Sequence, residues 1–197
     1  MKKYELTEET VTVYGKTLYR IRAVRDFGSV KTGEFGGYIE KEENLSHFGN
    51  AWVSGNAWVF DNARVYDDTW VYGNARVYDD AKVYDDAWVC GNAKVYDDAW
   101  VCGDAKVYGD AWVSGNAEVF NTMHFFVQGP IGSRNGFITF YRTKDNTVEV
   151  RCGCFSGSLQ KFVDRVEETH GGSRYEKEYK LAAELAKVCI RLEGESR

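Results

Sequence analysis

The sequence predicts a mainly β protein organised around a β-solenoid, and two features of residues 49–120 support this prediction. These residues form twelve consecutive hexapeptides without an insertion, each reading (Gly/Asp)-(Asn/Asp)-Ala-x-Val-(aromatic/Cys/Ser). Val fills the fifth position of every unit, and Ala fills the third in every unit but one, where Thr69 stands instead. A short fixed period of this kind is typical of a solenoid. The flanking sequence follows other patterns, so we expect three parts, at residues 1–44, 45–120 and 121–197.

Side-chain alternation explains how each hexapeptide folds. In an Ala-x-Val strand, successive side chains point to opposite sides, so Ala and Val face a shared interior and x faces outward. The preceding (Gly/Asp)-(Asn/Asp) pair tolerates left-handed and turn conformations and therefore forms a corner every six residues. Three corners close one triangular coil, so the twelve units form four coils. The prism is about 19 Å tall at a strand spacing of about 4.8 Å.

This pattern resembles the left-handed parallel β-helix of the hexapeptide-repeat proteins over residues 45–120. The resemblance implies the fold but little about activity, because enzymes and inert scaffolds share such coils. The first two parts together also look like a group of bacterial and prophage-encoded hexapeptide proteins. Two segments carry this second resemblance, Leu18-Tyr19-Arg20-Ile21-Arg22-Ala23 and Gly36-Gly37-Tyr38-Ile39-Glu40. Some of those relatives carry a transferase label that itself rests on the coil.

The outward-facing fourth residues stack on three faces, since every eighteenth residue shares a face. All six tryptophans of the chain occupy this position, and the first face carries Trp52, Trp70, Trp88 and Lys106. So much exposed indole is unusual on a soluble monomer. We therefore expect Trp52, Trp70 and Trp88 to form an interface between copies of the chain, with a trimer favoured. Two alternatives stay open: a helix of the same chain covers this face, or Trp stacks against neighbouring Arg and Lys.

Acidic residues stack at two of the three corners. One corner carries Asp61, Asp79 and Asp97, and the other carries Asp67 and Asp85. Cations have oxygen ligands available there, but the carboxylates match no known calcium loop. We interpret the corners as a solvated acidic edge that discourages aggregation.

Residues 1–44 are expected to form a β-rich cap, because the open end of a solenoid exposes unpaired backbone and core. The segments 10–14 and 17–24 flank Gly15-Lys16 and predict a hairpin. Residues 45–48 read as a degenerate hexapeptide that places His47 at the inward position of Val.

Residues 121–197 predict a small α+β domain in the order βββαα. The expected strands are 125–128, 137–143 and 148–154. Ser158 caps the first expected helix and Ser173 opens the second with a capping box. The expected apolar stripes are Leu159, Phe162, Val163 and Val166 on the first helix, and Leu181, Leu185, Val188 and Leu192 on the second.

The loop 128–136 is the best candidate for a binding site. Its glycines free backbone N–H groups to converge on a ligand, and Ser133, Arg134 and Asn135 add donors. Arg142 and Arg151 lie on the neighbouring predicted strands, so the set suits a phosphate or a carboxylate. The alternative is an ordinary connection, since Gly-Pro-x-Gly is also a good turn.

Metal and enzyme sites receive less support. Cys152, Cys154, Cys189 and His170 contain zinc ligand types but no Cys-x-x-Cys pair, so we expect buried thiols and no metal. A lone His124 is more often a packed residue than a general base. Hexapeptide acyltransferases typically extrude a loop between coils, and here the coil is unbroken. A carbonic anhydrase needs three converging histidines, whereas the three histidines of this chain lie in separate segments.

Charge and cysteine content restrict the partners. Residues 49–120 hold five basic and twelve acidic residues, so nucleic acid is a poor partner for the solenoid. Residues 121–197 hold twelve basic and ten acidic residues, which favours an anion there. The sequence contains no signal core or run of membrane-span length, and five cysteines fit reduced thiols, so we expect a cytoplasmic protein in a bacterial host.

These observations favour a non-catalytic binding protein without a cofactor. The coil would serve as an oligomerising scaffold, and the C-terminal part would bind a small anionic, nucleotide-like ligand or a host protein. For a prophage-like protein, sequestering a host signal or inhibiting a defence factor would fit. Two other classes stay open, an acyl- or nucleotidyl-transferase and a structural component of a phage particle.

Overall fold

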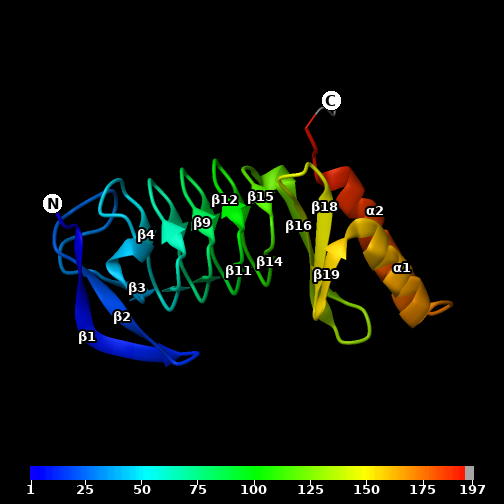
Figure 1. The fold of residues 1–197 in the computed structure, drawn as a ribbon, viewed down its shortest axis with the longest axis horizontal. Coiled ribbons are helices and arrows are strands. Elements are labelled where there is room, and N and C mark those ends of the chain that lie inside the picture. Colours follow the sequence, from blue (N-terminus) through cyan, green and yellow to red (C-terminus); the bar gives the residue numbers. More distant parts are fainter. Residues whose placement is uncertain (194–197) are drawn as a thin grey trace.

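The hexapeptides form a parallel β-solenoid in the middle of an elongated molecule, between an N-terminal sheet and a C-terminal sheet with two helices (Figure 1). The structure is a computed structural model, and it describes residues 1–193. Each hexapeptide contributes one two-residue strand, and strands eighteen residues apart pair in parallel. The first face holds β4 (Trp52–Val53), β7 (Trp70–Val71), β10 (Trp88–Val89) and β13 (Lys106–Val107). The second face holds β5 (Trp58–Val59), β8 (Arg76–Val77), β11 (Lys94–Val95) and β14 (Trp112–Val113). The third face holds β6 (Arg64–Val65), β9 (Lys82–Val83), β12 (Trp100–Val101) and β15 (Glu118–Val119).

The interior of the solenoid consists of the repeated Ala and Val side chains, as the alternation predicts. All of them are at most 2% exposed, and Thr69 is buried at its Ala position. The first residue of each corner has a positive φ, for example 60° at Asp61 and 70° at Gly91. At Gly91 an added Cβ would lie 3.0 Å from the backbone nitrogen of Gly109, so glycine permits both this conformation and the close approach of the next coil.

The N-terminal part continues the second face of the solenoid. It contains β1 (Tyr4–Val13), β2 (Lys16–Ala23), β3 (Phe35–Ile39) and the short η1 (Glu42–Asn44). The β1–β2 hairpin was predicted, but β1 begins earlier than expected and the turn is Tyr14-Gly15, because Lys16 already pairs with Val13; the hairpin projects from the body of the molecule (Figure 1). Because β3 pairs in parallel with β5 and Leu45 bridges Val65, the solenoid has about five turns, and the first is incomplete.

The prediction for His47 was wrong. Leu45 occupies the inward position instead, and it is fully buried. Leu45 pairs with a residue twenty positions later, so two extra residues lie in this turn and shift His47 out of phase. The His47 ring stacks beside Tyr4 with centroids 4.2 Å apart.

Side-chain donors close the N-terminal end of the solenoid. Lys3 Nζ donates to the carbonyl of Ala51 at 2.7 Å, and Asn44 Nδ2 donates to the carbonyl of Ala63 at 2.9 Å. These bonds satisfy carbonyl groups that no further coil can reach.

The first face is covered in part by the chain itself. Trp52 is fully buried beneath the N-terminal cap, where Phe27 lies edge-on at 5.3 Å. Trp52 therefore cannot belong to an interface between copies, which corrects that part of the prediction. Trp70 is half-buried, and Trp88 is 41% exposed with Lys106 Nζ 4.9 Å above its ring. An interface through Trp70 and Trp88 stays a prediction.

The C-terminal part has one strand more than predicted. It contains η2 (Thr122–His124), β16 (Phe125–Ile131), β17 (Gly136–Arg142), β18 (Val148–Cys152), β19 (Phe155–Ser158), α1 (Leu159–His170) and α2 (Arg174–Cys189). The four strands form one antiparallel sheet, with Gly153 and Cys154 in the turn between β18 and β19. Ser158 and Ser173 cap the two helices as predicted.

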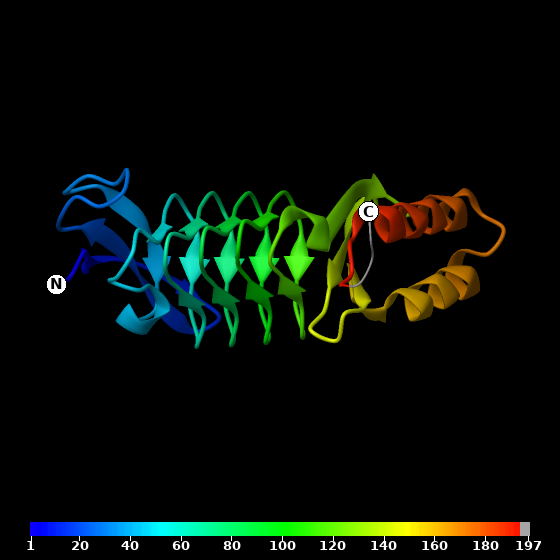
Figure 2. The ribbon, with the colours of Figure 1, turned by 90° about the horizontal axis from the view of Figure 1, so that it is seen from above.

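This sheet forms a layer between the solenoid and the helices (Figures 1 and 2). The alternation along β17 explains the layering. Ile138 and Phe140 pack with the helices, whereas Thr139 and Tyr141 face the last coil. The C-terminal part therefore closes the second open end of the solenoid.

The apolar stripe predicted for α2 was wrong for three of its four residues, since only Leu192 packs against the core. Leu181, Leu185 and Val188 are 71%, 47% and 79% exposed. The buried face of α2 consists instead of Tyr179, Ala182, Ala183 and Ala186. Small alanines let the helix lie close to the sheet and to α1. Among residues 1–193, no helix combines the length and apolar character needed to cross a membrane.

Candidate functional site

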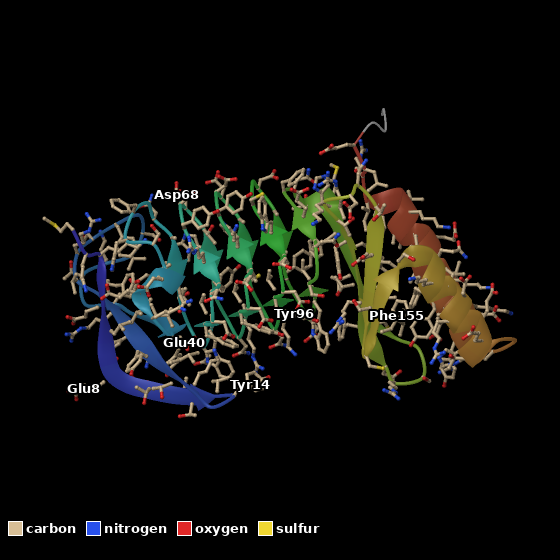
Figure 3. All side chains as sticks on the ribbon, viewed as in Figure 1. Glu8, Tyr14, Glu40, Asp68, Tyr96 and Phe155 are labelled. Atoms are coloured by element: carbon tan, nitrogen blue, oxygen red, sulfur yellow. The ribbon has the colours of Figure 1, made fainter. Side chains whose placement is uncertain are left out.

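A cavity of about 650 Å³ lies at one end of the C-terminal sheet, where the β16–β17 and β18–β19 turns meet the helices and the last solenoid coil. Its volume falls within the usual range for small-molecule sites. Tyr96 and Phe155, labelled in Figure 3, mark the solenoid side and the sheet side of this junction. The residues that line the cavity are Asp110, Trp112, Ser133, Arg134, Gly136, Phe137, Thr139, Arg151, Cys152, Gly153, Cys154, Phe155, Phe162, Arg165, Val166, Thr169, His170 and Tyr179.

The glycine-rich loop is a tight hairpin turn. β16 and β17 pair as far as Ile131 and Gly136, which leaves residues 132–135 to turn the chain. Gly132 has φ of +72°, and an added Cβ would lie 1.9 Å from the Tyr179 hydroxyl oxygen. Its N–H donates to Glu178 Oε2 on α2 at 2.8 Å, so the loop already binds a carboxylate of the same chain. The turn is thereby fixed against α2 and presents Ser133 and Arg134 to the cavity.

Arg151 is the most distinctive group in the cavity. Its guanidinium lies 5.5 Å from the ring centroid of Tyr96 and 5.8 Å from that of Trp112. Its Nε is buried and has no hydrogen-bond partner among residues 1–193. A buried donor without a partner is costly. The arrangement therefore favours an acceptor, such as a ligand oxygen, close to Arg151.

Two predicted binding residues lie outside the cavity. Arg142 is 2% exposed and fully engaged, because its Nη1 lies 3.2 Å from Glu118 Oε2 and its Nη2 lies 2.8 Å from Glu193 Oε1. Its guanidinium also lies over the Phe120 ring at 4.5 Å. Asn135 is in the left-handed region, with φ of 47°, and completes the hairpin turn. The structure therefore brings together Ser133, Arg134 and Arg151 of the predicted set.

The cavity also contains residues that the sequence did not single out. Arg165 adds a third guanidinium, and Phe137, Phe155, Phe162 and Tyr179 supply aromatic surface. Phe137 is 40% exposed, which is unusual for a large apolar side chain beside a hydrophobic core. The positive charge near the turns and the cluster of aromatic residues in 125–162 were visible in the sequence. Only the packing of the helices shows that these basic and aromatic residues line one cavity.

Burial keeps the thiol of Cys152 protonated. Desolvation raises the pKa of Cys152, although its hydrogen bond with Tyr179 acts in the opposite direction. A thiol with a raised pKa is a poor nucleophile. Cys152, Cys154 and His170 line the cavity and Cys189 does not. Among residues 1–193, no three His, Cys, Asp or Glu side chains lie close enough to hold a metal ion.

His124 lies outside the cavity and has a structural contact. Its Nδ1 accepts a hydrogen bond of 3.3 Å from the N–H of Phe120, at the end of the last coil. Burial is the main cause that lowers the pKa of His124, and Arg142 adds to it. His124 therefore favours its neutral form, and its ring nitrogen caps the backbone N–H of Phe120 at the end of the last coil.

A second, larger groove of about 830 Å³ runs along the third face of the solenoid. Basic and acidic side chains alternate in it, including Arg64, Asp80, Lys82 and Glu118, and Lys82 Nζ lies 4.6 Å above the Trp100 ring. The mixed charge gives this groove no preference for anions.

One comparison with known proteins agrees with the fold. The repeat family described as YdcK Beta solenoid repeat matches residues 57–73, which lie in the early coils of the solenoid. The chain is a β-solenoid protein. No curated protein matches this β-solenoid protein.

Proposed function

We propose that this β-solenoid protein is a non-catalytic binding protein that holds a small anionic ligand with an aromatic group, such as a nucleotide, in the C-terminal cavity. The main support for the proposal is Arg151, which lines this cavity. Its Nε is buried and has no hydrogen-bond partner among residues 1–193. The solenoid serves as a rigid scaffold that supplies one wall through Trp112.

The chemistry of the cavity fits such a ligand. Arginine binds phosphate and carboxylate oxygens through two parallel hydrogen bonds, and Arg134, Arg151 and Arg165 come from three different elements. Aromatic side chains offer stacking surfaces for a base, with energies of about 0.5 to 1.5 kcal/mol per pair beyond burial. Exposed Phe137 and half-buried Phe155 are the side chains placed for this role.

Binding without catalysis explains the groups in the cavity better than acyl or nucleotidyl transfer. The Cys152 thiol is held in its unreactive form, and His124 caps the solenoid at a distance from the cavity lining. For a protein encoded by a prophage, such a site would sequester a host signal and lower its free concentration. A role as a phage structural component would leave the unpartnered Arg151 unexplained.

The test is calorimetric titration of the purified protein with ATP, AMP and a cyclic dinucleotide, alongside Arg134→Ala and Arg151→Lys. We expect at least one nucleotide to bind and both variants to weaken it about tenfold or more, because each loses a guanidinium whose charge-assisted hydrogen bonds to a phosphate are worth about 1.5 to 3 kcal/mol. The lysine variant keeps the charge at residue 151 but loses the planar fork.

Arg64→Ala is the matched control, because it removes an exposed arginine from the groove on the third face. Loss of binding in this variant, with Arg151→Lys unaffected, would place the ligand in the groove and reject the proposal. Chromatography of the titrated sample would detect any conversion of the nucleotide. Such a conversion would show that the protein is a transferase or a hydrolase instead.

A further inference from the structure

A row of three cations runs along the second face of the solenoid without a carboxylate partner. Lys94 pairs with Arg76 of the preceding coil, and Arg151 follows at the C-terminal end. Arg76 lies 4.4 Å from the centroid of the Trp58 ring. Lys94 and Arg151 lie 4.1 and 5.8 Å from the centroid of the Trp112 ring. Within residues 1–193, none of the three cations has a carboxylate oxygen within 4.0 Å.

The three cations repel one another. Burial is the main cause that lowers the pKa of Lys94, and both Arg76 and Arg151 add to it. The ring contacts hold the charges in a row but do not neutralise them. An anion that spans the row would therefore relieve this repulsion without breaking an ion pair.

The acidic residues of the solenoid are concentrated at its other corners. The two corners that flank the third face carry Asp61, Asp79, Asp80, Asp97 and Asp98, and Asp67, Asp68, Asp85, Asp86 and Asp104. The corner between the first and second faces carries the amides of Asn56, Asn74 and Asn92 and a single carboxylate, that of Asp110. The stacked rings of Phe60, Tyr78 and Tyr96 separate the row from the acidic corner that borders the second face. The acidic net charge of the solenoid therefore does not describe its second face.

The row of cations forms the floor of a trough with a wall at each end. At the N-terminal end, a groove of about 480 Å³ is lined by Val11 and Tyr38 together with Trp58 and Arg76. At the C-terminal end, Arg151 lines the cavity described above. Figure 1 shows the β1–β2 hairpin and the connection between β16 and β17 projecting on the side of the solenoid that carries β11 and β14.

We propose that this trough binds a short single-stranded oligonucleotide, whose phosphates contact Arg76, Lys94 and Arg151. Cations interleaved with aromatic rings suit a single strand, because its bases stack while its phosphates bind the cations. A double helix is too stiff to bend into a trough with a wall at each end. Its second strand would also lie over the acidic corner, which repels phosphate.

The proposal goes beyond the proposed function and does not rest on it. Arg76 and Lys94 lie outside the lining of the C-terminal cavity, and Arg151 and Trp112 belong to both sites. Binding to the trough can therefore be tested separately from binding to the cavity.

Fluorescence anisotropy of a labelled single-stranded hexathymidylate, titrated with the purified protein over a salt series, tests the proposal. Three phosphate contacts predict that the logarithm of the association constant falls with the logarithm of the salt concentration at a slope of about −2. Arg76→Ala and Lys94→Ala should each weaken binding about two- to fivefold and make the slope shallower by about 0.7, because each removes one contact. Unfolding midpoints would confirm that each variant is folded.

Lys82→Ala is the matched control. Lys82 has the same position in its hexapeptide as Lys94 and lies 4.6 Å from the centroid of the Trp100 ring, but on the third face between the two acidic corners. We expect this variant to bind the hexathymidylate as the native protein does. Equal losses in Lys82→Ala and Lys94→Ala would show non-specific attraction to the solenoid and would overturn the proposal. Absence of binding at low salt would overturn it as well.

Competitors distinguish the ligand and the site. An unlabelled single strand should displace the probe, and a duplex of the same length should not. Displacement by inorganic polyphosphate at an equal phosphate concentration would show that phosphate alone is recognised, which would overturn the assignment to an oligonucleotide. If the native protein binds the hexathymidylate through Arg76 and Lys94 but does not bind AMP, the proposed function fails and the trough stands.

Discussion

The hydroxyl of Thr139 accepts a hydrogen bond of 3.0 Å from the backbone N–H of Trp112. Trp112 begins the last strand of the second face, so its N–H has no further coil to pair with. A side chain of β17 therefore replaces the missing strand at this point. The same β17 residue is 2% exposed, which keeps water from taking its place.

Replacing Thr139 with Val should destabilise the protein by about 1 to 3 kcal/mol. Valine keeps the size and the β-branch of threonine but leaves the buried N–H of Trp112 without an acceptor. Thr139→Ser is the control, since it keeps the hydroxyl. The measurement is the urea midpoint of unfolding, and equal midpoints for the two variants would show that the hydroxyl contributes nothing.

Replacing Trp52 and replacing Trp88, both on the first face of the solenoid, should reduce stability by very different amounts. Trp52→Ala empties a fully buried site and should cost about 3 to 5 kcal/mol. Trp88→Ala removes a side chain that is already 41% exposed, so we expect a cost below about 1.5 kcal/mol. Thermal unfolding of both variants checks this. Similar losses would contradict the burial of Trp52 by the N-terminal cap.

Two corner glycines provide a matched pair of substitutions. Gly91→Ala and Gly109→Ala both place a Cβ at positive φ, at 70° and 67°. Each should lose on the order of 1 kcal/mol from the backbone conformation. Only at Gly91 does the new Cβ contact the next coil. A Cβ at Gly109 would have no neighbouring heavy atom of the described chain within 4 Å. Gly91→Ala should therefore unfold at the lower urea concentration, and the reverse order would contradict the coil contact.

Removing Arg142 should weaken the junction between the solenoid and the C-terminal part. Arg142→Ala leaves Glu118 without its buried partner, and we expect a loss of about 3 kcal/mol. Glu193→Gln is the control and should cost below about 1 kcal/mol, because that carboxylate is largely exposed. Limited proteolysis between residues 120 and 136 would report the loosened junction. Resistance equal to that of the native protein would contradict it.

Stability should fall as the pH is lowered from about 7.5 to 5. Burial is the main cause that lowers the pKa of both His47 and His124 below its usual value of about 6.5. The unfolded chain therefore binds protons at a higher pH than the folded chain, and protonation favours unfolding below about pH 6.5. Unfolding midpoints against pH check this, with the His47→Gln and His124→Gln variants expected to show a shallower slope. An unchanged slope in both variants would assign the effect to other groups.

The solenoid could be predicted in detail because each hexapeptide repeats the same local rule. The predicted neighbours Trp70, Trp88 and Lys106 do stack on one face. The stacking of Trp against cations, left open as an alternative, also occurs, as with Lys94 above Trp112 at 4.1 Å. The turn containing His47 escaped prediction because the two extra residues interrupt that rule.

The C-terminal part could be predicted only element by element. Periodicity selected the large side chains Leu181, Leu185 and Val188 as the core of α2, whereas the close approach of the helix requires alanines. For the site, proximity in sequence linked Ser133 and Arg134 correctly. Arg142 and Arg151 both lie on strands, so the sequence gives them the same expected role. The packing of the sheet against the last coil shows that Arg142 is structural and that Arg151 faces the cavity.

Because both ends of the solenoid are closed by their own contacts, the number of coils between the ends can vary. Lys3 and Asn44 contact only the first coils, and Thr139 and His124 contact only the last one. Because each coil contacts only its neighbours, whole eighteen-residue units can be gained or lost between these ends, each changing the length by about 4.8 Å. The solenoid thus acts as a modular spacer, which sets how far the hairpin at one end stands from the cavity at the other.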